Sequence, residues 1–112
     1  MQELVDDFIV LNSKGLVLAL CEKYYDENVL MLNNDEVFAK SMKEAYDKQE
    51  SFVSSIETFE AELLTSKIEG NVSDLTFHYK IVGQDAKVIK FTGRHIQTWE
   101  NGKIVKEAFY SE

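Results

Sequence analysis

His95 is the residue of this sequence whose side chain is best suited to chemistry near neutral pH. An imidazole can act there as an acid, a base or a hydrogen-bond donor. His95 lies in a strand-like segment, 86–100, in which apolar and aromatic residues recur at every second position. It is therefore the candidate catalytic residue, although a lone histidine on an apolar strand face is more often a satisfied core residue than a catalyst.

Several aromatic residues with a polar tip accompany this histidine. Tyr24, Tyr79, Trp99 and Tyr110 could orient a ligand. Buried tyrosine and tryptophan side chains, however, more often belong to the core and find a partner for their OH or NH group. Both interpretations stay open for each of the four residues.

No metal or cofactor site is expected from the sequence. Cys21 is the single cysteine. It lies in an apolar helical stretch, where a free thiol usually behaves as a small hydrophobic group. The two histidines, His78 and His95, show no spacing typical of metal ligands. We therefore expect no metal ion and no cofactor.

The register of the terminal hairpin decides which side chains share a face with His95. Asn101-Gly102 between alternating segments is the strongest short-range signal of a two-residue β-turn. The expected pairs are Glu100 with Lys103, Trp99 with Ile104, Gln97 with Lys106, His95 with Ala108 and Gly93 with Tyr110. The opposite face would then carry Arg94, Ile96, Thr98, Val105, Glu107 and Phe109, with Arg94 and Glu107 as a surface ion pair or dimer contact.

A second register, counted from the preceding turn, leads to the same face for His95. A three-residue loop at 84–86 pairs Ile81 with Ile89, Tyr79 with Phe91, Phe77 with Gly93, and Leu75 with His95. His78 then falls on the outer face. Gly93 removes a side chain opposite Phe77, so the sequence predicts space beside His95.

Hydrophobic periodicity predicts the helices and strands in the rest of the chain. Helices are expected near residues 3–12, 14–24 and 41–54, the second capped by Ser13 and the third by a capping box from Ser41 to Glu44. Strands should start near residues 28, 56, 73, 86 and 103, with a bulge between Leu64 and Ile68. We expect one α+β domain over residues 1–112, in which a curved antiparallel or mixed sheet wraps around the N-terminal helices.

Composition restricts the classes of partner. The 112 residues are 45% hydrophobic, which is enough for one core. The net charge of −8 argues against binding to nucleic acid or to an anionic membrane surface. There is neither an apolar run of spanning length nor a basic start typical of a signal peptide. The expected location is cytoplasmic, and the expected partners are a small molecule or a second copy of the chain.

Several short motifs together resemble the SnoaL-like branch of the nuclear transport factor 2-like superfamily. They are Tyr25-Asp-Glu-Asn-Val29 after the second helix, the Ser-led third helix, Trp99-Glu-Asn-Gly-Lys-Ile-Val105, and Phe109-Tyr110-Ser111. The resemblance covers nearly the whole chain. It implies a cone-shaped α+β barrel with a pocket between the sheet and the first helices, and usually a homodimer formed through the sheets. It implies no single chemistry, because the members include isomerases, cyclases, dehydratases, epoxide hydrolases and plain binding domains.

The ketosteroid isomerase pattern within this superfamily does not carry over. The position of the Asp base after the first strand is occupied here by Asn33, and the position of the Tyr donor in the first helix by Phe8. His95 stands at the position of the second Asp, and Tyr110 corresponds to the pocket aromatic near the C-terminus. The candidate ligand-binding residues are Tyr24, Asn33, Phe77, Tyr79, His95, Trp99 and Tyr110.

Two functions therefore remain as hypotheses. One is an internal pocket for a small hydrophobic molecule, serving ligand binding or chemistry of the isomerase, cyclase or dehydratase type, with His95 handling a proton. The other is a non-catalytic homodimeric binding or association module that uses the apolar centre Ile96, Val105 and Phe109 on the outer sheet face. An internal cavity of several hundred Å³, typical of ligand sites, with His95 in its wall would favour the first.

Overall fold

The order of elements agrees with the sequence expectations, with one strand added. The computed structural model describes residues 1–112. Its elements are α1 (Gln2–Ser13), α2 (Val17–Tyr24), β1 (Tyr25–Asn33), β2 (Glu36–Ala39), α3 (Met42–Ser54), β3 (Ile56–Glu69), β4 (Val72–Gly83), β5 (Val88–Glu100) and β6 (Lys103–Ser111).

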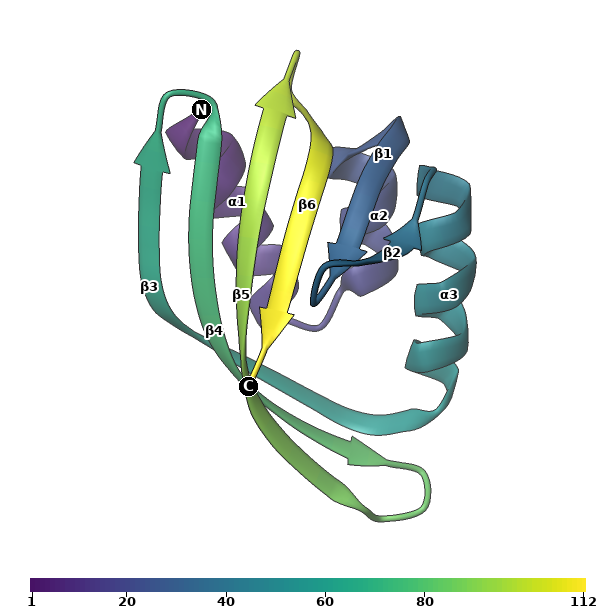
Figure 1. The fold of residues 1–112 in the computed structure, drawn as a ribbon. Coiled ribbons are helices and arrows are strands. Elements are labelled where there is room, and N and C mark those ends of the chain that lie inside the picture. Colours follow the sequence, from purple (N-terminus) through teal and green to yellow (C-terminus); the bar gives the residue numbers. More distant parts are fainter.

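The six strands form one curved, mixed sheet in the order β2-β1-β6-β5-β4-β3. Strands β1 and β6, the second and third in this order, are parallel, and all other neighbouring strands are antiparallel. Helices α1 and α2 cover one face of the sheet, and α3 lies beside β1 and β2 (Figure 1). The α+β prediction is confirmed. No helix is long and apolar enough to cross a membrane.

The N-terminal cap predicted for α3 is present, whereas the cap predicted for α2 is not. The Ser41 hydroxyl accepts a hydrogen bond from the backbone N–H of Glu44 at 3.1 Å, which confirms the expected cap of α3. The prediction that Ser13 caps α2 is wrong. Ser13 is the last residue of α1, and the chain turns through Gly15 with φ +72°, so that α2 begins only at Val17.

The segment after β1 turns the chain back into the same sheet. Asn34 and Asp35 adopt left-handed backbone conformations, with φ 49° and 68°, and this tight turn returns the chain as β2. Strand β2 was not expected from the sequence. On the long strand β3, the register shifts between Leu63 and Thr65 and leaves Leu64 unpaired, so the bulge lies at the start of the interval expected for it.

The terminal hairpin begins as predicted and then departs from the expected register. Glu100 pairs with Lys103 and Trp99 with Ile104, and Asn101 and Gly102 form the turn with φ 52° and 78°. A bulge follows, because Thr98 pairs with Lys106 and leaves Val105 without an opposite residue.

This bulge exchanges the two faces of β6 beyond Val105, since side chains of a strand alternate between faces. His95 pairs with Phe109 instead of Ala108, and Gln97 pairs with Glu107 instead of Lys106. Glu107 and Phe109 therefore face inward with His95, and the prediction that they lie on the outer face is wrong. The inward placement of Tyr110 is wrong for the same reason.

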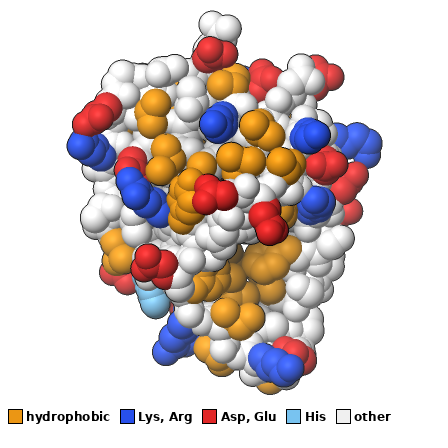
Figure 2. Space-filling model, viewed as in Figure 1, with side chains coloured by type: hydrophobic (Ala, Val, Ile, Leu, Met, Phe, Trp, Pro, Cys, Tyr) orange, Lys and Arg blue, Asp and Glu red, His pale blue; other side chains and the backbone are white.

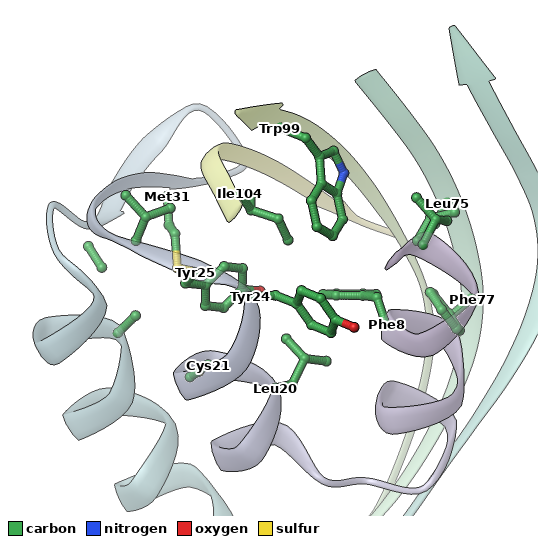
Figure 3. Packing of buried hydrophobic residues seen from close by; sticks show 14 of the residues in the cluster. Phe8, Leu20, Cys21, Tyr24, Tyr25, Met31, Leu75, Phe77, Trp99 and Ile104 are labelled. Atoms are coloured by element: carbon green, nitrogen blue, oxygen red, sulfur yellow. The ribbon is translucent and has the colours of Figure 1, made fainter. Parts of the chain in front are cut away.

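The core lies between the concave face of the sheet and the helices (Figure 3). Its aromatic members include Phe8 on α1, Tyr24 on α2, Phe77 on β4 and Trp99 on β5. The Tyr24 and Trp99 rings meet edge to face, with centroids 5.6 Å apart. Such a geometry is favourable for aromatic pairs. On the outer side of the sheet, Arg94 pairs with Asp74 at 2.6 Å and not with Glu107 as expected.

Cys21 should be inert toward thiol reagents in the folded protein. Burial raises the pKa of its thiol to about 12, with further contributions from the negative charges of Glu107 and Glu22. The reactive thiolate is therefore scarce at neutral pH. We expect Ellman's reagent to label the native protein far more slowly than the protein in denaturant. Equal labelling rates in the two conditions would contradict this placement of Cys21.

Candidate functional site

A cavity of about 270 Å³ opens between the concave face of the sheet and the three helices. Hydrophobic residues make up 13 of the 19 that line it. On the face shown in Figure 2, hydrophobic side chains gather around a hollow in the lower half of the view. The other six lining residues are polar: Asn12, Asn33, Lys48, Gln49, His95 and Glu107. The tyrosines Tyr25 and Tyr79 add a hydroxyl each.

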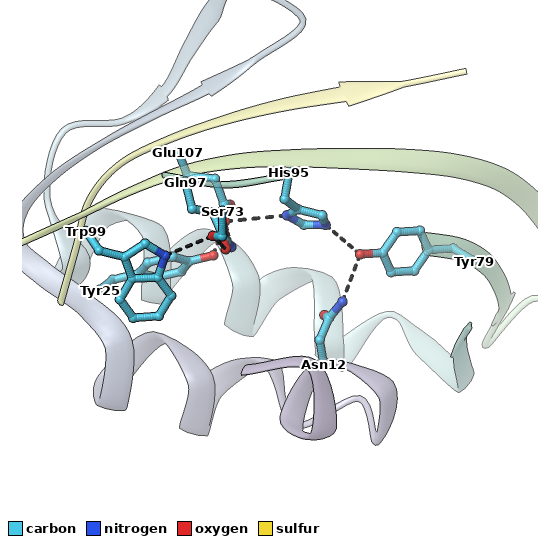
Figure 4. A network of polar contacts seen from close by, with 8 residues as sticks. All are labelled: Asn12, Tyr25, Ser73, Tyr79, His95, Gln97, Trp99 and Glu107. Atoms are coloured by element: carbon cyan, nitrogen blue, oxygen red, sulfur yellow. Dashed lines mark hydrogen bonds and ion pairs between the residues drawn. The ribbon is translucent and has the colours of Figure 1, made fainter. Parts of the chain in front are cut away.

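Asn12, Tyr79 and His95 form a line of hydrogen bonds from α1 through β4 to β5 (Figure 4). The Asn12 amide Nδ2 donates to the Tyr79 hydroxyl oxygen at 2.9 Å. The same hydroxyl lies 2.6 Å from Nε2 of His95. Because the Tyr79 oxygen already accepts from Asn12, its own hydrogen is free to point at Nε2, which then acts as the acceptor. The ring hydrogen of His95 accordingly resides on Nδ1.

Nδ1 of His95 faces the carboxylate of Glu107 across 3.4 Å. This distance is long for a hydrogen bond. Nδ1 has no other partner, so the contact is primarily electrostatic. Both side chains are enclosed, since His95 is 8% exposed and Glu107 is 2% exposed. An imidazole and a carboxylate thus meet inside the fold, on neighbouring strands.

Glu107 is held by two further donors that fix its position. Gln97 Nε2 donates to Oε2 at 2.6 Å, and the Tyr25 hydroxyl donates to Oε1 at 3.0 Å. Gln97 is itself held by Ser73, whose hydroxyl donates to Oε1 of Gln97 at 2.7 Å and accepts from Nε1 of Trp99 at 2.9 Å. Strands β4, β5 and β6 and the start of β1 all contribute to this network.

The surroundings set the protonation of the acidic groups. Burial is the largest influence on the pKa of Glu107 and raises it, but His95, Gln97 and Tyr25 together hold that pKa below its ordinary value. Glu107 is therefore a buried carboxylate at neutral pH. Burial raises the pKa of Tyr79, against the lowering effect of the hydrogen bond from Asn12, so Tyr79 remains a neutral hydroxyl donor.

The residues proposed from the sequence as ligand contacts fall into three groups. Asn33, Tyr79 and His95 line the cavity. Tyr24, Phe77 and Trp99 are buried in the core and do not line it. Tyr110 lies on the outer side, where its hydroxyl donates to Asp35 at 3.0 Å, because the bulge at Val105 turns it away from the cavity.

The sequence also led to expectations for His78 and Gly93. His78 lies on the opposite face of β4 from Tyr79 and is absent from the cavity wall, as expected. The space predicted beside His95 is the cavity, but it does not lie at Gly93 itself. A Cβ atom there would lie 2.6 Å from the Phe109 ring and 2.8 Å from the Tyr79 ring, so these two rings already fill the gap.

Most of the cavity wall was not predicted from the sequence. The missed residues include Asn12, Tyr25, Glu107 and Phe109, and also Lys48 and Gln49. Asn12 continues the buried stripe of Val5 and Phe8 along α1, so helical periodicity could have identified it. Glu107 and Phe109 depend on the bulge at Val105, for which the sequence has no evident signal. No group of three or more His, Cys, Asp or Glu side chains is arranged to hold a metal ion.

Comparisons with known proteins identify the fold. No family model and no curated protein matches this sequence. Solved structures match over almost the whole chain. A protein described as a SnoaL-like polyketide cyclase from Mesorhizobium loti superposes with a TM-score of 0.81 at 20% identity and covers 97% of both chains.

Two further matches come from other bacteria. A nuclear transport factor 2-like protein of unknown function from Burkholderia pseudomallei has a TM-score of 0.83 at 10% identity, covering 99% of this chain and 89% of that one. A hypothetical protein with a ketosteroid isomerase-like fold from Catenulispora acidiphila, in complex with trimethylamine, has a TM-score of 0.78 at 9% identity, covering 96% and 84%. At these identities the likeness shows a shared fold, and the site must be interpreted from its own residues.

Proposed function

We propose that this chain, which has the fold of SnoaL-like and nuclear transport factor 2-like proteins, binds a small hydrophobic carbonyl compound in the cavity and transfers a proton on it. The observation that carries the proposal is the pair formed by the Tyr79 hydroxyl and His95 Nε2, 2.6 Å apart in an otherwise largely apolar wall. A mostly apolar cavity with a few convergent polar groups is typical of small-molecule sites.

The two groups of this pair suit opposite halves of an enolisation. The neutral Tyr79 hydroxyl can turn its hydrogen from His95 to the carbonyl oxygen of a ligand and stabilise the negative charge that develops there. Nε2 of His95, released from that hydrogen bond, then has a free lone pair for the proton on the adjacent carbon. Because the two groups are close together, one carbonyl compound can contact both.

Glu107 and Asn12 position this pair. When Nε2 takes the proton, the imidazole becomes a cation, and the carboxylate of Glu107 facing Nδ1 stabilises it. Catalytic hydrogen bonds are often long without a ligand and shorten when one binds. The 3.4 Å separation fits this behaviour. Isomerisation, aldol-type cyclisation and dehydration all begin with such a proton transfer, so these reactions form the proposed class.

Blocking the cavity mouth should abolish ligand binding without affecting the fold. Gln49 lies on α3, lines the cavity and is half-buried, so Gln49→Trp places a large ring in the space that a ligand would occupy. We expect wild type to bind the neutral fluorescent probe N-phenyl-1-naphthylamine, and 2-acetonaphthone to displace it. The variant should raise the probe's Kd by about tenfold or more, equivalent to roughly 1.4 kcal/mol.

The control is Glu50→Trp, which places the same ring on the exposed side of α3 outside the cavity wall. It should bind the probe as wild type does, and circular dichroism should be unchanged in both variants. Failure of wild type to bind the probe, or an equal effect of the two substitutions, would contradict the proposal.

The alternative function, a homodimeric association module, has lost part of its basis. Two residues expected on its contact surface, Glu107 and Phe109, line the cavity instead. Ile96 and Val105 remain half-buried, but they no longer have Phe109 as an apolar neighbour on that face. The cavity hypothesis is therefore favoured, and the homodimer remains a proposal of its own.

A further inference from the structure

Two side chains of full charge line the cavity, and they differ in their surroundings. Glu107 is buried and its carboxylate accepts hydrogen bonds from Gln97 and Tyr25. Lys48 is exposed and is the only lysine or arginine in the cavity wall. The cavity therefore has a satisfied negative group inside and a positive group available to a ligand.

Lys48 stands where the cavity opens to the surface. Together with Asn33 and Phe38, it lines both the cavity and a neighbouring shallow depression on the outside. Its ammonium group donates to the backbone carbonyl of Phe38 and lies 5.0 Å from the centre of the Phe38 ring. These contacts hold the lysine at the mouth rather than letting it extend freely into solvent.

No carboxylate of the protein neutralises this lysine. Glu36 lines the same shallow depression, yet it forms no ion pair with Lys48, whereas Lys43 on the same helix pairs with Asp47. The chain carries a net charge of −8, so most of its surface repels anions. The mouth of the cavity is thus a local exception, with a cation beside the amide side chains of Asn33 and Gln49.

We infer that the ligand is an amphiphile, with an apolar body and a carbonyl group inside the cavity and a carboxylate at its mouth that pairs with Lys48. This inference rests on the proposed function and adds the charge and orientation of the ligand to it. The ammonium group attracts the carboxylate electrostatically, and the Asn33 and Gln49 amides are additional donors for it. The apolar walls exclude the same charged group from the interior, so the ligand can enter in one orientation.

A matched pair of ligands tests this preference. 1-Naphthaleneacetate and 1-naphthaleneacetamide share one apolar body and differ in charge, and each can be titrated against bound N-phenyl-1-naphthylamine. Wild type should bind the carboxylate more tightly than the amide, by about fivefold, as expected for a partly exposed ion pair. Lys48→Gln should remove this difference, Lys48→Glu should reverse it, and high salt should reduce it in wild type.

The matched control is Lys43→Gln, which removes an exposed lysine of the same helix outside the cavity and should preserve the preference of wild type. Binding of both ligands with equal affinity, unchanged in Lys48→Gln, would overturn the anionic preference and leave the proposed function standing. Binding of neither ligand, with no binding of the probe itself, would overturn both. An equal loss of preference in Lys43→Gln would assign the effect to net charge and would also overturn this inference.

Discussion

Replacing Glu107 with alanine should lower the free energy of unfolding by about 3–5 kcal/mol, the largest stability effect that we expect in this chain. The substitution leaves Gln97 Nε2, the Tyr25 hydroxyl and His95 Nδ1 facing a void without an acceptor. A buried donor that loses its partner keeps its full desolvation cost. Urea or guanidinium denaturation followed by circular dichroism measures the difference.

Glu100→Ala is the control for this experiment. Glu100 belongs to the same hairpin but is exposed and forms no side-chain hydrogen bond or ion pair. Its removal should therefore change the stability by less than about 0.5 kcal/mol, as is usual for surface substitutions. A Glu107→Ala variant as stable as Glu100→Ala would show that β6 does not place this carboxylate inside the fold.

The contribution of Glu107 should also depend on pH. The pKa of Glu107 in the folded protein lies below its ordinary value of 4.5, so the carboxylate stabilises the fold at pH values above 4.5. This stabilisation is lost as the pH falls through the lowered pKa, where the group becomes protonated. Glu107→Gln carries no such proton, so its stability should change less than that of wild type over the same acidic range.

Replacing His95 with glutamine should reduce proton transfer on a bound ketone by about 10²–10⁴-fold, the range typical of a lost general base. The assay follows deuterium exchange on the methyl group of 2-acetonaphthone in D₂O by NMR. Tyr79→Phe should reduce the same rate by about 10²–10³-fold, because it removes the donor to the carbonyl oxygen. Both variants should still bind N-phenyl-1-naphthylamine, since the apolar walls of the cavity are unchanged.

The corresponding control is His78→Gln on the outer face of β4. This variant should catalyse deuterium exchange on the methyl group of the ketone at the wild-type rate. Glu107→Gln distinguishes a positioning role from a purely structural one. It should slow the exchange with little change in probe affinity, because it removes the charge that stabilises the protonated imidazole. An exchange rate in His95→Gln equal to that of wild type would exclude His95 as the base.

The fold could be predicted from the sequence where local signals and long-range pairing agree. The pairs Leu75 with His95 and Tyr79 with Phe91 follow from alternation on both sides of one short loop, and the structure confirms them. The turn at 101–102 was equally clear. The turn sequence, however, determines only the two pairs next to it, Glu100 with Lys103 and Trp99 with Ile104.

The inward position of Glu107, which the sequence did not reveal, depends on one extra residue in β6. Val105 is an ordinary strand former, and nothing in its neighbours marks a bulge. Yet the shift at this position brings Glu107 inside and sends Tyr110 outside. Burial of the Glu107 charge becomes favourable only through its contacts with Gln97, Tyr25 and His95. Because these partners lie on other strands, no local sequence pattern could predict it.

The network that ends at Glu107 restricts where a proton can move. It starts at the indole of Trp99, which can only donate, and ends at a carboxylate, which can only accept. Ser73 and Gln97 between them are therefore fixed in one orientation, because a reversed Gln97 amide would set two oxygens 2.6 Å apart. The direction of every hydrogen bond along this branch is therefore fixed, so the branch cannot relay a proton. The proposed proton transfer is therefore assigned to the other branch, at Tyr79 and His95, where the cavity gives a ligand access.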